Sequence, residues 1–150
     1  MDIASWRERV LQLTRRHSQK EDLEFCQLVE RVDGMNDMVI VQTLMDTFTP
    51  TSETGVQQTV YRILGSFNIL LYYQAFFESL PRLVSEDAGW DLELAAYPER
   101  DPSGREVREI ASMARALPPE RRNLFLWVLS NDDFRSDHAW AEPLANAIAD

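Results

Sequence analysis

Apolar residues recur at helical spacing along almost the whole chain of 150 residues. They stand three and four positions apart, which places them on one face of a helix. The first such stretch runs from about Ile3 to His17, and comparable stretches follow up to Ile148. We therefore expect an all-α protein of eight or nine antiparallel helices, joined by short loops into a single domain over residues 1–150.

One segment, from Ile69 to about Val84, is apolar on all sides. A helix without a polar face is surrounded by other helices, so this segment is expected to be the central member of the fold. Pro81 is expected to kink or end it, because proline lacks the backbone donor and clashes with the preceding turn. Upstream, Thr51 or Ser52 is expected to cap the preceding helix.

Similar residues recur 37 residues apart in the second half of the chain. The matching positions are Leu80-Pro81 with Leu117-Pro118, Trp90 with Trp127, and Tyr97 with Phe134. A period near 40 residues with two helices in each unit is typical of stacked helical hairpins of the HEAT kind. The pattern fits an irregular HEAT-like α-solenoid, and it also fits a closed helical bundle.

The charge of the chain narrows the classes of partner. Asp and Glu number 25 against 15 Lys and Arg, which gives a formal net charge of −10. Such an excess repels nucleic acid and anionic membranes and attracts basic proteins over a range of roughly 8–10 Å. We therefore expect a protein partner, and neither nucleic acid nor a membrane. The alternative is that the charge serves solubility alone.

The cellular compartment is inferred from the cysteine content and from the lack of a secretion signal and of a membrane-spanning stretch. Cys26 is the only cysteine, so no internal disulfide can form, and a reducing cytoplasm suits the chain. The N-terminus has no basic stretch followed by an apolar run. The longest apolar stretch, Ile69–Phe77, is far shorter than the ~20 residues that cross a bilayer. These features predict a soluble, cytoplasmic protein.

No pattern of residues indicates catalysis. His17 and His138 lie at opposite ends of the chain, and neither has a metal-binding spacing. Phosphate-binding glycine loops and the G-x-S-x-G elbow are absent from the sequence. We expect no enzyme, cofactor or small-molecule substrate. The only cluster of possible metal ligands comprises Asp132, Asp133, Asp137 and His138, and we interpret it as solvated and helix-capping rather than as a metal site.

Acidic residues gather in two loops that occupy equivalent places in the 37-residue repeat. The members are Glu86, Asp87, Asp91, Glu93, Glu99 and Asp101 in the first loop, and Asp132, Asp133 and Asp137 in the second. If the repeat holds, both loops emerge at the same edge of the fold. Tyr97 and Phe134 lie within them as candidate aromatic anchors for a partner, whereas we interpret Trp90 and Trp127 as core residues.

The stretches Val60–Phe67 and Tyr72–Leu83, followed by Trp90, resemble the all-helical immunity proteins of bacterial polymorphic toxin and contact-dependent growth inhibition systems. The resemblance covers roughly residues 55 to 149 and concerns helix pattern and the placement of aromatic residues and proline. It implies a cytoplasmic protein that binds the toxic C-terminal domain of a cognate effector, often a nuclease, and blocks its active site.

These observations lead to one main hypothesis and two alternatives. The main hypothesis is an antitoxin whose acidic loops cover the basic active-site cleft of a nuclease toxin. The first alternative is a helical-repeat adaptor that binds a different protein partner. The second is a small enzyme or metal protein that uses Asp132, Asp133, Asp137 and His138.

Overall fold

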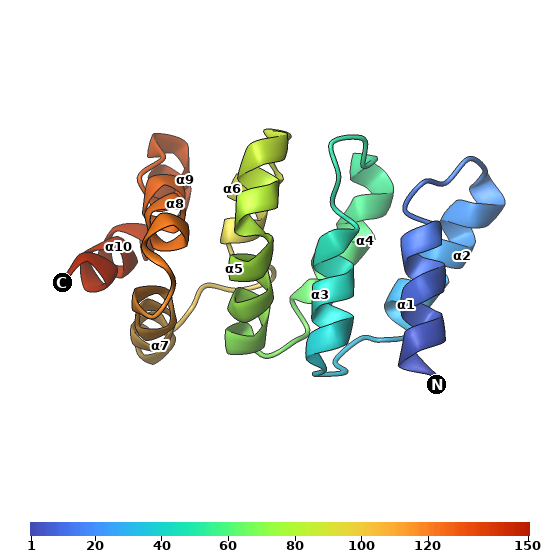
Figure 1. Ribbon diagram of the computed structural model, residues 1–150, viewed down its shortest axis with the longest axis horizontal. Coiled ribbons are helices and arrows are strands. Elements are labelled where there is room, and N and C mark those ends of the chain that lie inside the picture. Colours follow the sequence, from blue (N-terminus) through green and yellow to red (C-terminus); the bar gives the residue numbers. More distant parts are fainter.

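The computed structural model describes residues 1–150 and consists of helices and loops without a β-strand (Figure 1). The all-α expectation is confirmed. The helices are α1 (Ile3–Gln12), α2 (Gln19–Glu30), α3 (Met38–Asp46), α4 (Thr54–Leu64), α5 (Ile69–Glu86), α6 (Trp90–Ala95), α7 (Gly104–Arg115), α8 (Pro119–Leu129), α9 (Asp132–Asp137) and α10 (Ala141–Ala149). Ten helices exceed the expected eight or nine, because the sequence interpretation took the start of α9 for the end of α8.

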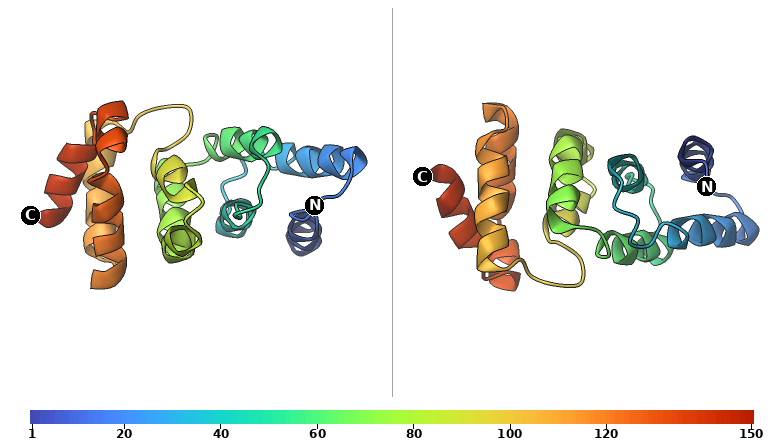
Figure 2. Two further views of the ribbon diagram at one scale, coloured as in Figure 1. Left: turned by 90° about the horizontal axis from the view of Figure 1, so that it is seen from above. Right: turned by 90° about the horizontal axis from the view of Figure 1, so that it is seen from below.

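Consecutive helices form hairpins that follow one another along the long axis in chain order (Figure 1). In the first half of the chain α1, α3 and α5 form one row, while α2 and α4 form a second row beside it (Figure 2). Contacts run within the rows, between α1 and α3, α3 and α5, and α2 and α4, as well as across each hairpin. At the C-terminal end α10 packs against both α7 and α8.

The first helix of each of the first four hairpins begins at a residue whose side chain accepts a hydrogen bond from the helix backbone. These N-caps are Asp2, Asp37, Asn68 and Ser103, spaced 35, 31 and 35 residues apart. Each side-chain oxygen satisfies an amide that has no partner within the helix. Ser103 and Glu106 complete a reciprocal capping box. This spacing, shorter than the 37 residues proposed from sequence, marks the structural unit.

The core is one continuous cluster of 40 buried apolar residues, and α5 crosses its middle. Five large side chains of α5 are buried: Tyr72, Tyr73, Phe76, Phe77 and Leu80. This helix contacts α3, α6, α7 and α8, so its predicted central position is confirmed. The expectation that Pro81 ends the helix is wrong, because α5 continues through Pro81 to Glu86.

Two further local expectations are corrected. The first helix ends at Gln12 rather than near His17, and Thr14–His17 form the turn into α2. Neither Thr51 nor Ser52 caps α4, whose N-cap is Glu53 without a side-chain hydrogen bond. The Ser52 hydroxyl instead donates to the Thr47 carbonyl and accepts from the Thr49 amide, which closes the preceding turn.

None of the helices combines the length and apolarity that crossing a membrane requires.

Candidate partner-binding groove

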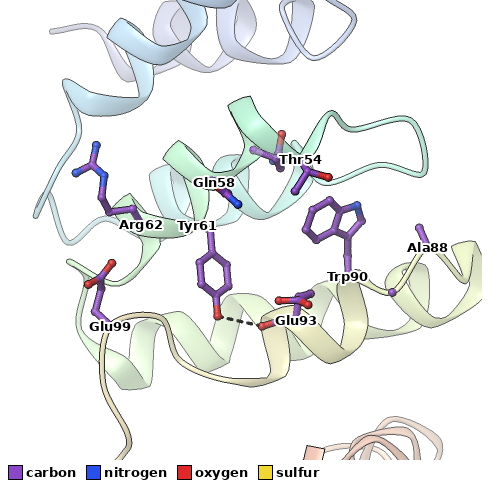
Figure 3. Close-up of a pocket in the computed structure, with 10 residues that line it drawn as sticks. Thr54, Gln58, Tyr61, Arg62, Ala88, Trp90, Glu93 and Glu99 are labelled. Atoms are coloured by element: carbon purple, nitrogen blue, oxygen red, sulfur yellow. Dashed lines mark hydrogen bonds between the residues drawn. The ribbon is translucent and has the colours of Figure 1, made fainter. Parts of the chain in front are cut away.

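A hollow of about 600 Å³ lies between α4 and α6 (Figure 3). We call it the α4–α6 pocket. Tyr61 of α4 points across it toward α6, where its hydroxyl donates to the Glu93 carbonyl at 3.4 Å. Ten residues line the pocket: Thr54, Gln57, Gln58, Tyr61, Arg62, Ala88, Gly89, Trp90, Glu93 and Glu99.

Tyrosine hydroxyls from α5 hold the short α6 in place. The last carbonyls of a helix have no partner within it, and a six-residue helix has few internal bonds to stabilise it. Tyr72 donates to the Leu94 carbonyl at 2.6 Å, and Tyr73 donates to the Ala95 carbonyl at 2.8 Å. Burial raises the pKa of both phenols, so both remain protonated donors. This anchoring fixes the position of Glu93.

A second, smaller hollow adjoins the α4–α6 pocket, and a third adjoins the second. Tyr61 and Glu93 also line the second hollow, of about 220 Å³, which reaches α9. Leu92 and Asn131 are shared between the second hollow and a third, of about 320 Å³, at the end of α8. Because neighbouring hollows share walls, the three form a run along α4, α6, α8 and α9, which we call the acidic groove.

The acidic groove brings together carboxylates from both acidic loops. The second hollow alone combines Glu93 with Asp133 and Asp137. Five carboxylates line the acidic groove as a whole, against one cationic side chain: Glu93, Glu99, Asp132, Asp133 and Asp137, with Arg62. The sequence argument that the two loops share an edge is therefore met for these five residues, although the 37-residue period behind it does not describe the helical unit.

None of these five carboxylates takes part in an ion pair. The chain forms seven ion pairs, and their carboxylates are all other residues. Arg62, the one cation at the acidic groove, is itself engaged by Glu30 at 3.3 Å. All five carboxylate residues are also exposed. The acidic groove therefore presents negative charge that the protein does not neutralise.

The remaining acidic candidates lie outside the acidic groove. Glu86 pairs with Arg82 at 2.6 Å, and Asp101 accepts a hydrogen bond from the Trp140 indole at 3.2 Å. Asp87 is exposed at the end of α5 with a left-handed backbone. Asp91 is buried, and this burial, reinforced by the nearby charge of Asp87, raises the pKa of its carboxyl. Asp91 is thus part of the packed interior and is not exposed to a partner.

The expectation that Tyr97 is an exposed anchor is wrong. Its side chain is only 6% exposed, and its hydroxyl donates to the Gly65 carbonyl at 2.7 Å and also lies within hydrogen-bond distance of the Phe67 carbonyl. The ring packs edge to face on Tyr72. Tyr97 ties the loop after α6 to the loop between α4 and α5.

Phe134 is likewise a core residue, with 5% of its surface exposed. It packs between His138 and Trp140, with ring centroids 4.6 and 5.6 Å away. It borders the second hollow, while the neighbouring aspartates of α9 remain exposed. An amphipathic six-residue helix can bury only one side, and the apolar ring takes it.

Trp127, interpreted from sequence as core, is instead 60% exposed. It borders the third hollow beside Asp132. The indole nitrogens of the other tryptophans, Trp6, Trp90 and Trp140, donate to Leu28, Thr49 and Asp101 respectively, whereas the Trp127 indole makes no such bond. Trp90 is half-buried, as a wall of the α4–α6 pocket. The aromatic side chain available to a partner is thus Trp127.

The cluster of possible metal ligands does not converge. No three His, Cys, Asp or Glu side chains lie close enough together to hold a metal ion. The ring of His138 packs at a tilt against Phe134 and against Trp140, whose centroid is 5.4 Å from its own.

The chain matches no protein-family model, no curated protein and no solved structure.

Proposed function

We propose that this protein is an immunity protein that binds the toxic domain of a cognate bacterial effector, a basic nuclease, and neutralises it without catalysis. The observation that carries the proposal is the acidic groove, where five exposed carboxylates from two loops stay unpaired. A nuclease needs a basic cleft for the phosphate backbone, so a surface of this charge is complementary to it.

The fold suits such a role. We infer that the stacked hairpins form a short α-solenoid, in which each unit contacts its neighbours and the surface extends with every unit. The acidic groove runs along consecutive units, from α4 to α9. A partner lying along it meets carboxylates over its whole length, with Trp127 at one end as an aromatic contact. Exposed tryptophan beside charge is typical of residues that dominate binding energy.

Purification of the protein from its native host, with mass spectrometry of whatever chain remains bound, tests the proposal directly. We expect a basic polypeptide with a toxic, nuclease-type C-terminal domain, encoded next to this gene. Recovery of a basic chain without a toxic domain would instead identify the protein as a helical adaptor, and an acidic partner would contradict both assignments.

Two matched triple variants then test the role of the acidic groove. The groove variant carries Asp132→Asn, Asp133→Asn and Asp137→Asn, while the control carries Glu8→Gln, Glu120→Gln and Glu142→Gln. All six residues are exposed and none forms an ion pair. Each variant removes three negative charges, so the two have equal net charge. We expect the groove variant to lower the association rate constant with the partner by about tenfold at low salt. Equal rates for the two variants would reject a groove-directed mode of binding.

A further inference from the structure

The α4–α6 pocket differs from the rest of the acidic groove, because aromatic walls stand beside its carboxylates. Tyr61 and Trp90 border it from α4 and α6, and Glu93 and Glu99 are exposed at its edge (Figure 3). A positive side chain that enters such a site gains from the negative faces of the rings as well as from the carboxylates. The composition of the pocket is therefore suited to an organic cation.

Gln57 adds a hydrogen-bond acceptor to the α4–α6 pocket. This side chain lines the α4–α6 pocket although it is only 2% exposed. Its amide nitrogen donates to the Thr47 hydroxyl at 2.7 Å, while no donor of the chain reaches its carbonyl oxygen. This oxygen is not sealed from solvent, so a ligand that carries N–H groups can donate to it.

The aromatic wall is held rigidly before any ligand arrives. The Trp90 indole donates to the Thr49 carbonyl at 3.0 Å, and its ring packs edge to face on Phe48 with centroids 5.0 Å apart. A side chain fixed in this way loses little conformational freedom on binding. The protein also stacks its own guanidinium groups on rings, since Arg16 lies 4.1 Å above the centroid of Phe25.

The N-terminus of α4 favours an anion at the pocket, but its partial positive charge is smaller than the negative charge of the two glutamates. The first turn of α4 borders the pocket through Thr54, and α4 has no side-chain cap. A helix N-terminus acts as roughly half a positive charge. Glu93 and Glu99 supply two full negative charges, and Arg62 is already paired with Glu30. The balance is negative and selects a cation.

We propose that the α4–α6 pocket binds one arginine side chain of the partner protein. A guanidinium presents five planar N–H donors, which match carboxylate and amide acceptors, and it stacks on aromatic rings more readily than a lysine ammonium. The volume of about 600 Å³ lies within the range of small-ligand sites, so the pocket admits the whole side chain. This inference rests on the proposed function in that the arginine belongs to the basic partner.

Blocked amino acids test the pocket without the partner. N-acetyl-arginine amide, the lysine analogue and the neutral citrulline analogue are titrated into the protein, and the indole N–H signal of Trp90, assigned through Trp90→Phe, is followed by NMR. We expect the arginine probe to shift this signal in a saturable way in the millimolar range, the lysine probe to bind several-fold more weakly, and the citrulline probe to leave it unchanged. Equal shifts with citrulline, or none with arginine, would overturn the proposal.

A double variant and a control variant test whether the two glutamates bind the arginine probe. Glu93→Gln and Glu99→Gln, combined, are expected to weaken arginine binding at least tenfold, whereas Glu8→Gln on α1 removes a charge far from the pocket and is expected to leave it unchanged. A folded double variant that binds arginine like the wild type would reject the site. Failure of the arginine probe alongside capture of a basic partner removes the pocket but not the proposed function. If the protein binds the arginine probe but captures no basic partner, the pocket stands and the proposed function is rejected.

Discussion

The phenol of Tyr97 donates to the backbone carbonyl of Gly65, with 2.7 Å between the two oxygens. This bond joins two loops 32 residues apart in the sequence and places Glu99 at the α4–α6 pocket. Tyr97→Phe removes the donor and leaves buried carbonyls without a partner, so we expect a loss of about 1–3 kcal/mol in the free energy of unfolding. Urea denaturation measures it. Tyr61→Phe, whose bond is longer and half-exposed, serves as the control and should change stability much less.

Gly65 itself permits the close approach of these loops. A Cβ added there would lie 2.5 Å from Glu99 Cγ and 2.8 Å from the Pro98 carbonyl oxygen. Gly65→Ala is therefore expected to destabilise the protein by about 1–3 kcal/mol in urea unfolding, because backbone must shift to admit the methyl group. Gly55→Ala is the control at the other end of α4, which Gly65 caps, with nothing within 4 Å of the added carbon. It should be neutral or stabilising by up to about 1 kcal/mol.

Trp127 and Phe125 lie two positions apart on α8 and face opposite ways. Phe125→Ala empties a fully buried site and should cost about 3–5 kcal/mol. Trp127→Ala removes a larger ring from the surface and should cost less than about 1 kcal/mol. Urea unfolding of the two variants compares them. A large loss of stability from Trp127→Ala would contradict its exposed position, and with it its availability to a partner.

The ion pair of Glu106 and Arg100 predicts a dependence of stability on pH. The Arg100 guanidinium, 2.6 Å away, lowers the pKa of Glu106 to about 2 from an ordinary value of 4.5. A carboxyl whose pKa is lower in the folded state stabilises the fold above the ordinary value, and this stabilisation is lost as pH falls through about 2. Wild-type protein should thus exceed Glu106→Gln in stability at pH 6, and the difference should vanish near pH 2. In an Arg100→Met background the same difference should already disappear nearer pH 4, as urea unfolding across this range would reveal.

Asp91 predicts the opposite dependence. Burial raises the pKa of its carboxyl, so the folded protein binds the proton more readily than the unfolded chain does, and the ionised form opposes folding at neutral pH. Asp91→Asn is expected to raise the thermal midpoint at pH 7, with a gain that shrinks as pH falls through the carboxyl range. Asp132→Asn is the matched control, since Asp132 also lies in the first turn of a six-residue helix but is exposed. A lower midpoint for both variants would show that charge at the helix start outweighs burial.

The sequence predicted those features of the fold that depend on local physics. The all-sided apolarity of Ile69–Val84 marked the central helix, and Pro119 at a first helical position marked the start of α8. Pro81 misled the prediction because packing on four helices holds α5 together despite the bond lost at proline. Local propensity alone carries no information on that packing.

The sequence could not predict which face of α8 is buried. Leu124–Leu129 is a run of six apolar residues, so several helical faces fit the pattern equally well. The buried face is Phe125, Val128 and Leu129, which turns Trp127 outward. The sequence interpretation took Leu124, Trp127 and Val128 instead. A polar face of Asn123, Trp127 and Ser130 was the available clue, since its flanking members are polar.

The candidate site was predicted in part. The acidic character of the two loops is a matter of composition, and five of the nine acidic candidates line the acidic groove. The aromatic anchors were misassigned, because Tyr97 carries both a ring to bury and a hydroxyl to satisfy, and only tertiary structure decides which governs. Gln57 and Tyr61 were missed, since their place in the α4–α6 pocket depends on where α6 docks.

Extensive contacts in this protein never join helices more than three places apart in the chain. Because no packing between distant segments resists a change of curvature, such a stack of helices bends more easily than a globular domain. A small rotation at each hairpin adds up along the stack, so the width between α4 and α9 can adjust to what lies against it. The proposed partner would therefore be able to change the curvature of this scaffold without unfolding any of its helices.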